Sequence, residues 1–176
     1  MLGMRNYGFV ILHSQHFHLY ALFCLSIPRI FLIMIKVAII GAGAAGCFCA
    51  VNLKRMMPEA DITVYESGKK PLAKVAVTGG GRCNLTNLHA NQQGYHGEEP
   101  NFAESALIRY DVEDTLNWFR SMGLYTVAEE SGRVYPYSDQ ANSVVDVLRF
   151  ALCRPNIQLL TGFEVTKVKK TDGGFR

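Results

Sequence analysis

The segment that decides the fold is IKVAIIGAGAAGCFCAVNLKRMMPEADITVYE, residues 35–66. Its first part, residues 35–40, is short, apolar and rich in β-branched side chains, which is typical of a buried parallel strand. After a glycine turn, residues 44–57 carry small side chains at helical spacing, and Pro58 ends the helix. A second apolar strand follows at residues 62–65. The segment therefore predicts a right-handed βαβ unit, the start of an α/β fold with a parallel sheet.

The turn inside this unit has the spacing G-x-G-x-x-G, with glycines at 41, 43 and 46. Gly41 allows a tight turn, Gly43 lets backbone amides approach a pyrophosphate, and Gly46 permits close packing of helix on strand. Phosphates are favoured at the helix N-terminus by free N–H groups and by the helix dipole. Glu66 follows the second strand, where it can accept hydrogen bonds from both ribose hydroxyls and would repel a 2′-phosphate. The turn thus favours FAD or NAD over NADP, and it does not choose between FAD and NAD.

A second glycine-rich stretch, KVAVTGGGRCNLTN, occupies residues 74–87. Three consecutive glycines give a backbone that can pass very close to a planar or anionic ligand, and the polar residues after them supply donors. The stretch lies within residues 67–100, which is longer than a loop that only connects two elements usually is. We therefore interpret it as a functional loop.

Three stretches together resemble the YhiN/BaiN-like family of NAD(P)/FAD-dependent oxidoreductases, also described as aminoacetone oxidase-like flavoproteins. They are GAGAAG, KVAVTGGGRCNLTN and GRVYPYSDQANSVVDVL, the last at residues 132–148. The resemblance covers residues 34–176. It implies an α/β, Rossmann-like FAD/NAD(P)-binding domain of the glutathione-reductase two-dinucleotide type, truncated here, since family members are longer and carry a second, inserted domain. It also implies that hydride passes from NAD(P)H through FAD to a small organic acceptor, and one branch resembles reductases of conjugated C=C bonds in oxidised bile acids.

The resemblance also implies which residues bind the cofactor. The glycine turn would hold the FAD pyrophosphate and Glu66 its ribose, while the second glycine-rich stretch would lie along the ribityl chain and the isoalloxazine. Val165 would meet the adenine through its backbone. The full implied set is Gly41, Gly43, Ala44, Ala45, Gly46, Glu66, Lys74, Thr78, Gly79, Gly80, Gly81, Arg82, Cys83, Asn84 and Val165.

Arg82 and Cys83 are the candidates for catalytic roles, and each has a plainer interpretation. A fixed cation at Arg82 would stabilise an anionic reduced flavin, or it would form an ion pair with a neighbouring loop or with Asp139. A dithiol reductase requires a second cysteine shortly after Cys83, and residues 86–88 (Thr-Asn-Leu) fill that space. Cys83 is therefore favoured as a small residue lining the flavin loop, and the catalytic residues stay open.

Composition limits the classes of function. Of the 176 residues, 49% are hydrophobic and 19% are charged, which indicates a globular chain and excludes a disordered or coiled-coil one. Eighteen Lys and Arg against fifteen Asp and Glu leave a net charge of +3, too little to indicate a nucleic-acid partner. The five cysteines contain no CxxC pair, so we expect a reduced, cytoplasmic protein without a metal site.

The N-terminal stretch is strongly apolar from residue 8 to residue 35, as in a signal peptide or membrane anchor. Histidines and the Pro28-Arg29 pair interrupt it, and it continues without a linker into the first strand. We therefore expect no membrane span, a biological start at Met34, and residues 1–33 as upstream sequence, with an amphiphilic extension as the alternative. Residues 34–176 then form the FAD-binding domain, incomplete at its C-terminus.

Spacing also predicts the remaining elements. A helix is expected over residues 102–122, ended by Gly123, and a further helix capped by Ser138 should run to about Cys153. Residues 158–175 are expected to form a strand, an alternating strand and a Gly-Gly turn that opens a hairpin whose return strand is missing.

Three functions are compatible with these patterns. The first is the flavoenzyme described above, acting on a small-molecule substrate. The second is an NAD-linked dehydrogenase domain, which leaves the triple-glycine stretch unexplained, and the third is a catalytically inert, truncated nucleotide-binding module. The electron acceptor, the choice of NADH or NADPH and the oligomeric state stay open at this point.

Overall fold

The computed structural model describes residues 35–90, 94, 96–172 and 174–176. The expectations about residues 1–33 and a start at Met34 lie outside the described residues, as does nearly all of the apolar N-terminal stretch. In the described part of the chain, no helix is long and apolar enough to cross a membrane.

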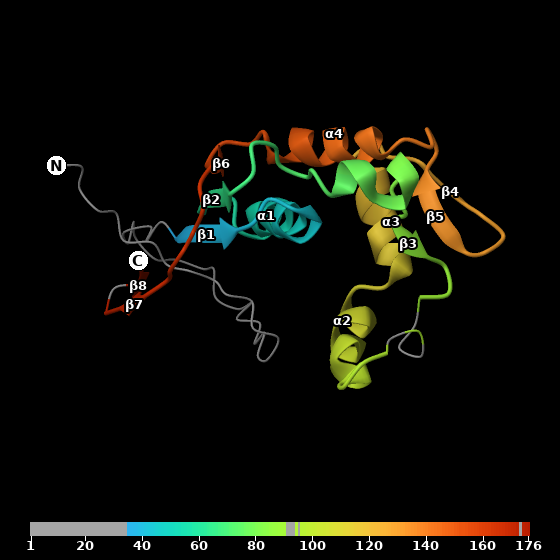
Figure 1. Cartoon of the computed structure of the whole chain (residues 1–176), viewed down its shortest axis with the longest axis horizontal. Helices are drawn as coiled ribbons and strands as arrows, with labels where there is room; N and C mark the ends of the chain where they lie inside the picture. Colours follow the sequence, from blue (N-terminus) through green and yellow to red (C-terminus); the bar gives the residue numbers. More distant parts are fainter. Residues whose placement is uncertain (1–34, 91–93, 95, 173) are drawn as a thin grey trace, which may run out of the picture.

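A three-stranded parallel sheet holds the βαβ unit, at the end of the molecule where the described chain begins (Figure 1). Its elements are β1 (Lys36–Ile40), α1 (Ala44–Met56), β2 (Asp61–Glu66) and β6 (Ile157–Thr161). The strand order is β1-β2-β6, with Ile62 opposite Val37 on one side and Ile157 on the other. The predicted strand, helix and strand are therefore confirmed to within one or two residues.

A small antiparallel sheet of order β3-β5-β4 lies at the opposite end of the molecule, with α1, α3 and α4 between the two sheets (Figure 1). The remaining elements are η1 (Val75–Gly81), β3 (Thr86–Asn87), η3 (Pro100–Ala103), α2 (Glu104–Arg109), α3 (Val112–Ser121), β4 (Thr126–Ala128), β5 (Arg133–Pro136), α4 (Ala141–Leu152), β7 (Lys170–Thr171) and β8 (Gly174–Phe175).

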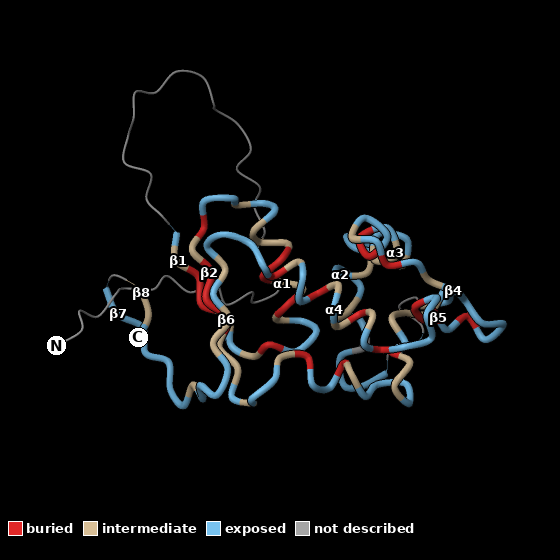
Figure 2. Tube along the Cα trace, turned by 90° about the horizontal axis from the view of Figure 1, so that it is seen from above, coloured by how far each residue is buried: buried red, intermediate tan, exposed pale blue. Residues whose placement is uncertain are grey.

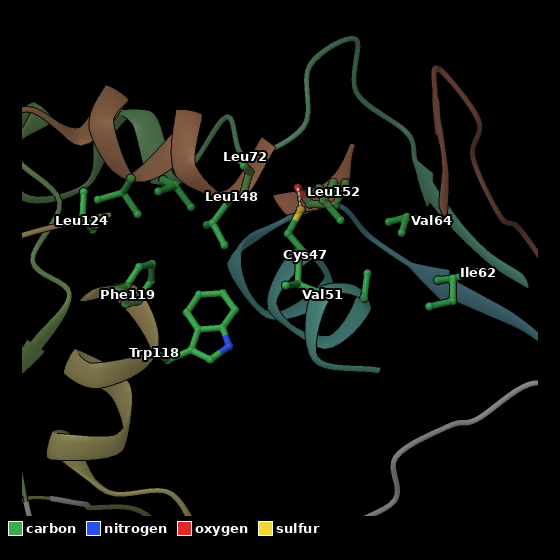
Figure 3. Packing of buried hydrophobic residues seen from close by; sticks show 14 of the residues in the cluster. Cys47, Val51, Ile62, Val64, Leu72, Trp118, Phe119, Leu124, Leu148 and Leu152 are labelled. Atoms are coloured by element: carbon green, nitrogen blue, oxygen red, sulfur yellow. Dashed lines mark hydrogen bonds between the residues drawn. The ribbon is translucent and has the colours of Figure 1, made fainter. Parts of the chain in front are cut away.

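The hydrophobic core joins these parts, and the buried stretches of the chain lie along β1, β2, α1 and α4 and also reach α3 and β5 (Figure 2). Cys47 and Val51 of α1 are buried between the sheet and α4, which contributes Leu148 and Leu152. Figure 3 shows Trp118 of α3 pointing toward α1 in the same cluster. Burial of these side chains fixes α1 against both the sheet and the helices, and so it sets the position of the glycine turn at the start of α1.

Two helix predictions need correction. The helix expected over residues 102–122 is interrupted, because Asp111 begins a new helix: its Oδ1 accepts from Asp114 N at 2.8 Å, and Asp114 Oδ2 accepts from Asp111 N at 3.1 Å. This reciprocal capping box outweighs the continuous apolar spacing. Ser138 does not cap α4, since its hydroxyl lies 2.7 Å from that of Ser143 and the helix begins after Gln140 without a side-chain cap.

The C-terminal prediction is also partly wrong. The second, alternating strand does not form, because the chain leaves the parallel sheet at Gly162 (φ +74°), whose N–H bonds to Gly68 O. The expected hairpin is present, but its return strand is not missing. It is β8, which pairs with β7 over two residues each, Lys170 lying opposite Phe175.

Candidate functional site

The glycine turn joins β1 to α1 and leaves the start of the helix open. Gly41 has φ +94°, and its N–H donates to Tyr65 O at 2.7 Å, which ties the turn to β2. A Cβ at Gly46 would lie 1.9 Å from Gly41 O, so a side chain is excluded by backbone. At Gly43, the N-cap of α1, a Cβ would meet nothing within 4 Å, and no side chain caps the helix. The start of α1 thus has open space beside Gly43 and no side-chain cap on its N–H groups, as an anion site requires.

Glu66 closes this turn from the end of β2. Its Oε2 accepts from Ala42 N at 2.8 Å and its Oε1 from Gly68 N at 2.7 Å. The hydrogen bonds from Gly68 and Ala42 hold the pKa of this carboxyl below its ordinary value, so the group is ionised at neutral pH. Ser67 Oγ also donates to Oε1 at 3.4 Å, so Oε1 already accepts two hydrogen bonds while Oε2 accepts one and can accept another from a sugar hydroxyl.

The triple-glycine stretch forms a tight loop at the end of η1. Gly79, Gly80 and Gly81 have φ of +57°, +67° and +88°, a region that side chains rarely adopt. Arg82 N donates to Gly79 O at 3.3 Å and Cys83 N to the carbonyl of residue 78 at 3.0 Å, which close the loop on itself. Cys83 is buried and has φ +60°, so it lies on the inner side of the loop.

A cavity of about 340 Å³ brings the two glycine motifs together. The turn contributes Ala44 and Ala45 from the first turn of α1, and the loop contributes Thr78, Cys83 and Asn84. Its size lies at the lower end of the range for small-molecule sites. The other lining residues are Phe48, Val75, Leu85, Thr115, Phe119, Val144 and Leu148.

Sequence reasoning missed the apolar wall of this cavity. Phe48 lies one helical turn after Ala44, so its spacing alone was a signal that it shares the face of α1 that begins at the glycine turn. Thr115 and Phe119, at the same spacing on α3, line the cavity as well. Val144 and Leu148 come from α4, and that helix meets the loop only through the tertiary fold.

Five of the fifteen implied residues line the cavity, namely Ala44, Ala45, Thr78, Cys83 and Asn84. The described lining does not include Gly41, Gly43, Gly46, Glu66, Gly79, Gly80, Gly81 or Arg82, which lie in or next to the two motifs, and it does not include Lys74 or Val165. Lys74 is exposed at the start of η1, and Val165 lies in the irregular segment between β6 and β7. The chain approaches Glu66 just before Val165, since Phe163 N donates to Glu66 O at 2.9 Å. The roles implied for Lys74 and Val165 stay predictions.

Larger hollows of about 540 and 670 Å³ lie along α4, and both are lined by Phe150 and Asp146. No residue implied by the sequence lines either of them in the described structure. The candidate site is therefore the smaller cavity, because it is where two motifs more than thirty residues apart in the chain converge.

The cysteines of the described chain are all free: Cys47, Cys49, Cys83 and Cys153. Burial raises the pKa of the Cys47 thiol to about 11, with Glu66 contributing less, so Cys47 is protonated at neutral pH. Its Sγ donates to Ala42 O at 3.5 Å, the contact drawn in Figure 3. These observations favour packing roles, as expected for Cys83 from its lack of a neighbouring cysteine.

Comparison with known proteins agrees with this geometry. The model of the HI0933-like protein Rossmann domain matches residues 35–176. The chain is 38% identical over 142 residues to the 3-dehydro-bile acid delta(4,6)-reductase of Clostridium scindens, and the match covers 81% of this chain and 34% of the reductase. It is 34% identical over 132 residues to the ribosomal RNA dihydrouridine synthase of Haemophilus influenzae, and that match covers 75% of this chain and 32% of the synthase.

Among solved structures, THI4 of Thermovibrio ammonificans is similar with a TM-score of 0.45 and 12% identity, over 80% of this chain and 44% of that one. The chain spans about a third of the length of the curated relatives it matches. A family match that spans all the described residues, together with the βαβ unit and its glycine turn, establishes that the chain belongs to the HI0933-like family and forms its Rossmann domain.

Proposed function

We propose that the chain is the FAD-binding part of an oxidoreductase that passes hydride from NAD(P)H through the flavin to a small organic acceptor. The observation that carries the proposal is the cavity at which the glycine turn and the triple-glycine loop meet. A dehydrogenase domain that binds NAD at the turn alone would have no use for a second glycine loop beside it. Flavin has both a pyrophosphate and a large planar ring, and it therefore accounts for both motifs.

The residues present fit this cofactor. The open space at Gly43 accommodates a pyrophosphate at the N-terminus of α1, where backbone N–H groups and the helix dipole favour negative charge. Glu66 is ionised and retains an acceptor site for a ribose hydroxyl. The loop presents Thr78 and Asn84 beside the apolar Phe48 and Phe119, a mixture suited to a ring with polar edges.

When bound, FAD accepts a hydride from a nicotinamide nucleotide and donates it to an acceptor. The protein's own residues bind, orient and shield. Phe48, Val144 and Leu148 would supply an apolar wall that limits water at a bound ring, while the loop backbone and the Asn84 side-chain oxygen would supply polar contacts. The Asn84 amide nitrogen itself donates to Thr86 O at 2.8 Å and to Val134 O at 3.2 Å.

The acceptor we propose is a C=C bond conjugated to a carbonyl group. The two curated relatives differ in substrate, one being named for 3-dehydro bile acids and the other for uridine in ribosomal RNA. Both names describe the same chemistry, because the carbonyl draws electrons from the double bond and makes its far carbon accept hydride. The net charge of +3 on this chain is too small to indicate an RNA partner, so we propose the small-molecule acceptor.

The test is a titration of the full chain with FAD and, separately, with NAD. Trp118 is the single tryptophan of the sequence, and its ring centroid lies 5.0 Å from that of Phe119 in the cavity wall. FAD binding is therefore expected to quench its fluorescence saturably and to give a structured visible spectrum. NAD bound without flavin would contradict the proposal, and binding of neither would favour the inert module.

The acceptor is tested with the flavin-loaded chain and NAD(P)H. A 3-oxo-4-ene steroid should be reduced, and its saturated analogue should not stimulate NAD(P)H oxidation. Reduction of uridine in an RNA fragment, with the steroid untouched, would instead assign the RNA chemistry.

A further inference from the structure

Arg82 follows directly after the three glycines of the loop, and yet it is not among the described residues that line the cavity. Its guanidinium turns to the other side of the loop. There Nε donates to Asp139 Oδ1 at 2.5 Å and Nη2 donates to Glu129 Oε1 at 2.9 Å. Its Cζ also lies 3.9 Å from the centroid of the Tyr135 ring. One side chain thus connects the loop to the turn after β4, to β5 and to the turn before α4.

The rest of the loop is anchored from outside, because η1 packs on α4 and Leu85 N donates to Val134 O at 2.8 Å, but the glycines themselves have no side chains to pack. The loop's internal hydrogen bonds span three to five residues, and three successive glycines lose more backbone entropy on ordering than any other residues would. The same ring also lies beside the first glycine of the loop, since a Cβ added at Gly79 would be 3.5 Å from Tyr135 Cε1. Tyr135 therefore supports both the first glycine of the loop and the guanidinium that follows it.

Asp139 connects this arrangement to the opposite wall of the cavity. It is a non-glycine residue with φ +55°, a strained conformation that persists where the surroundings fix it. The next residue, Gln140, is the N-cap of α4, and α4 carries Val144 and Leu148 into the cavity. The Arg82–Asp139 ion pair therefore joins the loop wall of the cavity to its helical wall.

We propose that Arg82 is a positioning residue. With Asp139 and Glu129 it forms a clamp that fixes the end of the glycine loop relative to α4, in addition to the packing of η1 on that helix, and flavin affinity depends on the position of that end. The inference rests on the proposed function, because its ligand is FAD. An isolated exposed ion pair contributes little, but a fork-shaped donor shared by two carboxylates and stacked on a ring is fixed in direction. Arg82 thus affects flavin binding through the position of the loop, and its own positive charge does not contact the flavin.

The experiment is a double-mutant cycle on the full chain, with FAD dissociation constants measured by Trp118 quenching. If Arg82 is a clamp, Arg82→Gln and Asp139→Asn should each raise Kd about five- to tenfold, and the double variant should bind no worse than the weaker single one. If Arg82 instead supplies charge to the flavin, Arg82→Gln alone should weaken binding and Asp139→Asn should leave it unchanged or tighten it. That second pattern would overturn the proposal.

Glu130 offers a matched control, because it is an exposed carboxylate next to Glu129 and no ion pair joins it to Arg82. Glu129→Gln should weaken FAD binding, while Glu130→Gln should not. Arg82→Lys keeps the charge but cannot reach both carboxylates, so its Kd should fall between those of the parent chain and Arg82→Gln. Equal binding by Arg82→Lys and the parent would overturn the clamp.

Two further readouts separate positioning from loss of fold. In the absence of FAD, Asp139→Asn should unfold at the temperature of the parent chain, while its FAD-induced rise in Tm is smaller and its bound-flavin spectrum less structured. If the flavin-free variant shows a fall in Tm large enough to account for its weaker FAD binding, the inference is overturned. Failure of the parent chain to bind FAD would overturn the proposed function itself and the clamp with it.

Discussion

The substitutions Gly43→Ala and Gly46→Ala add the same methyl group to the same turn, and the structure predicts opposite consequences for them. At Gly46 the new Cβ would lie 1.9 Å from Gly41 O, where an ordinary contact is 3.4 Å or more. The start of α1 must then move away from β1 by about 1.5 Å, against a core in which Cys47 is fully buried. We expect a loss of about 3 kcal/mol in the free energy of unfolding, typical of a forced overlap in a packed site.

At Gly43 the backbone has φ −80° and ψ −169°, which any residue adopts, and the Cβ points into open space. Folding is therefore expected to change by less than about 1 kcal/mol. The space is nevertheless the one assigned to the pyrophosphate. Displacing one charge-assisted hydrogen bond to phosphate costs about 1.5–3 kcal/mol, which is roughly a ten- to hundredfold rise in the FAD Kd.

The assay is thermal unfolding without FAD, followed by FAD titration. For a chain of this size, the Gly46→Ala loss corresponds to a fall in Tm of about 6–12 °C, while Gly43→Ala should unfold within about 4 °C of the parent. Tight FAD binding by Gly43→Ala would refute the placement of the phosphates. An unchanged Tm for Gly46→Ala would refute the close approach of α1 to the turn.

Three further predictions follow from other contacts. Two backbone N–H donors lower the pKa of Glu66 in the folded state, so its contribution to stability is present above the unfolded pKa of about 4.3 and is lost as the pH falls through the folded pKa. In urea unfolding, the free energy of unfolding of Glu66→Gln should therefore fall less steeply with decreasing pH than that of the parent chain. Cys47, whose pKa is about 11, should resist iodoacetamide at pH 8 while the exposed Cys153 is alkylated, and mass spectrometry of the native chain would contradict this if it found the reverse order. Asn52→Ala removes the acceptor 2.8 Å from Trp118 Nε1 and should cost about 1–3 kcal/mol in urea unfolding, whereas Asn52→Asp, which keeps the acceptor, should recover most of it.

The sequence was informative where structure is local. The strands and helix of residues 35–66 follow from apolar period and glycine spacing, and the structure confirms them within one or two residues. The break at Asp111 was missed because apolar periodicity continues across it, while the capping box depends on the paired side chains of Asp111 and Asp114. Residues 162–169 alternate like a strand, but the described structure forms no strand there, since the glycine at 162 turns the chain away from the parallel sheet.

The residues of the candidate site also fall into those that the sequence predicted and those that it missed. The motif residues were predicted because glycine spacing and Glu66 have a local physical meaning. The wall made by Thr115 and Leu148 was missed, because it depends on how α3 and α4 pack and no short pattern encodes that. For Arg82, the ion pair with Asp139 was one of two interpretations, and the structure supports it and adds Glu129 as a second partner.

The order of strands in the parallel sheet has a consequence for synthesis of the chain. β2 pairs with β6, whose partner residue for Ile62 is Ile157, so about 95 residues must be made before the sheet closes, or roughly 5–20 s at ordinary translation rates. The glycine turn can form early, since β1, α1 and β2 are neighbours, but Leu148 arrives late and completes the cavity. A nascent chain therefore exposes the edge of β2 before it has a finished cofactor pocket, and during that interval a ligand cannot stabilise it, because the binding site is incomplete.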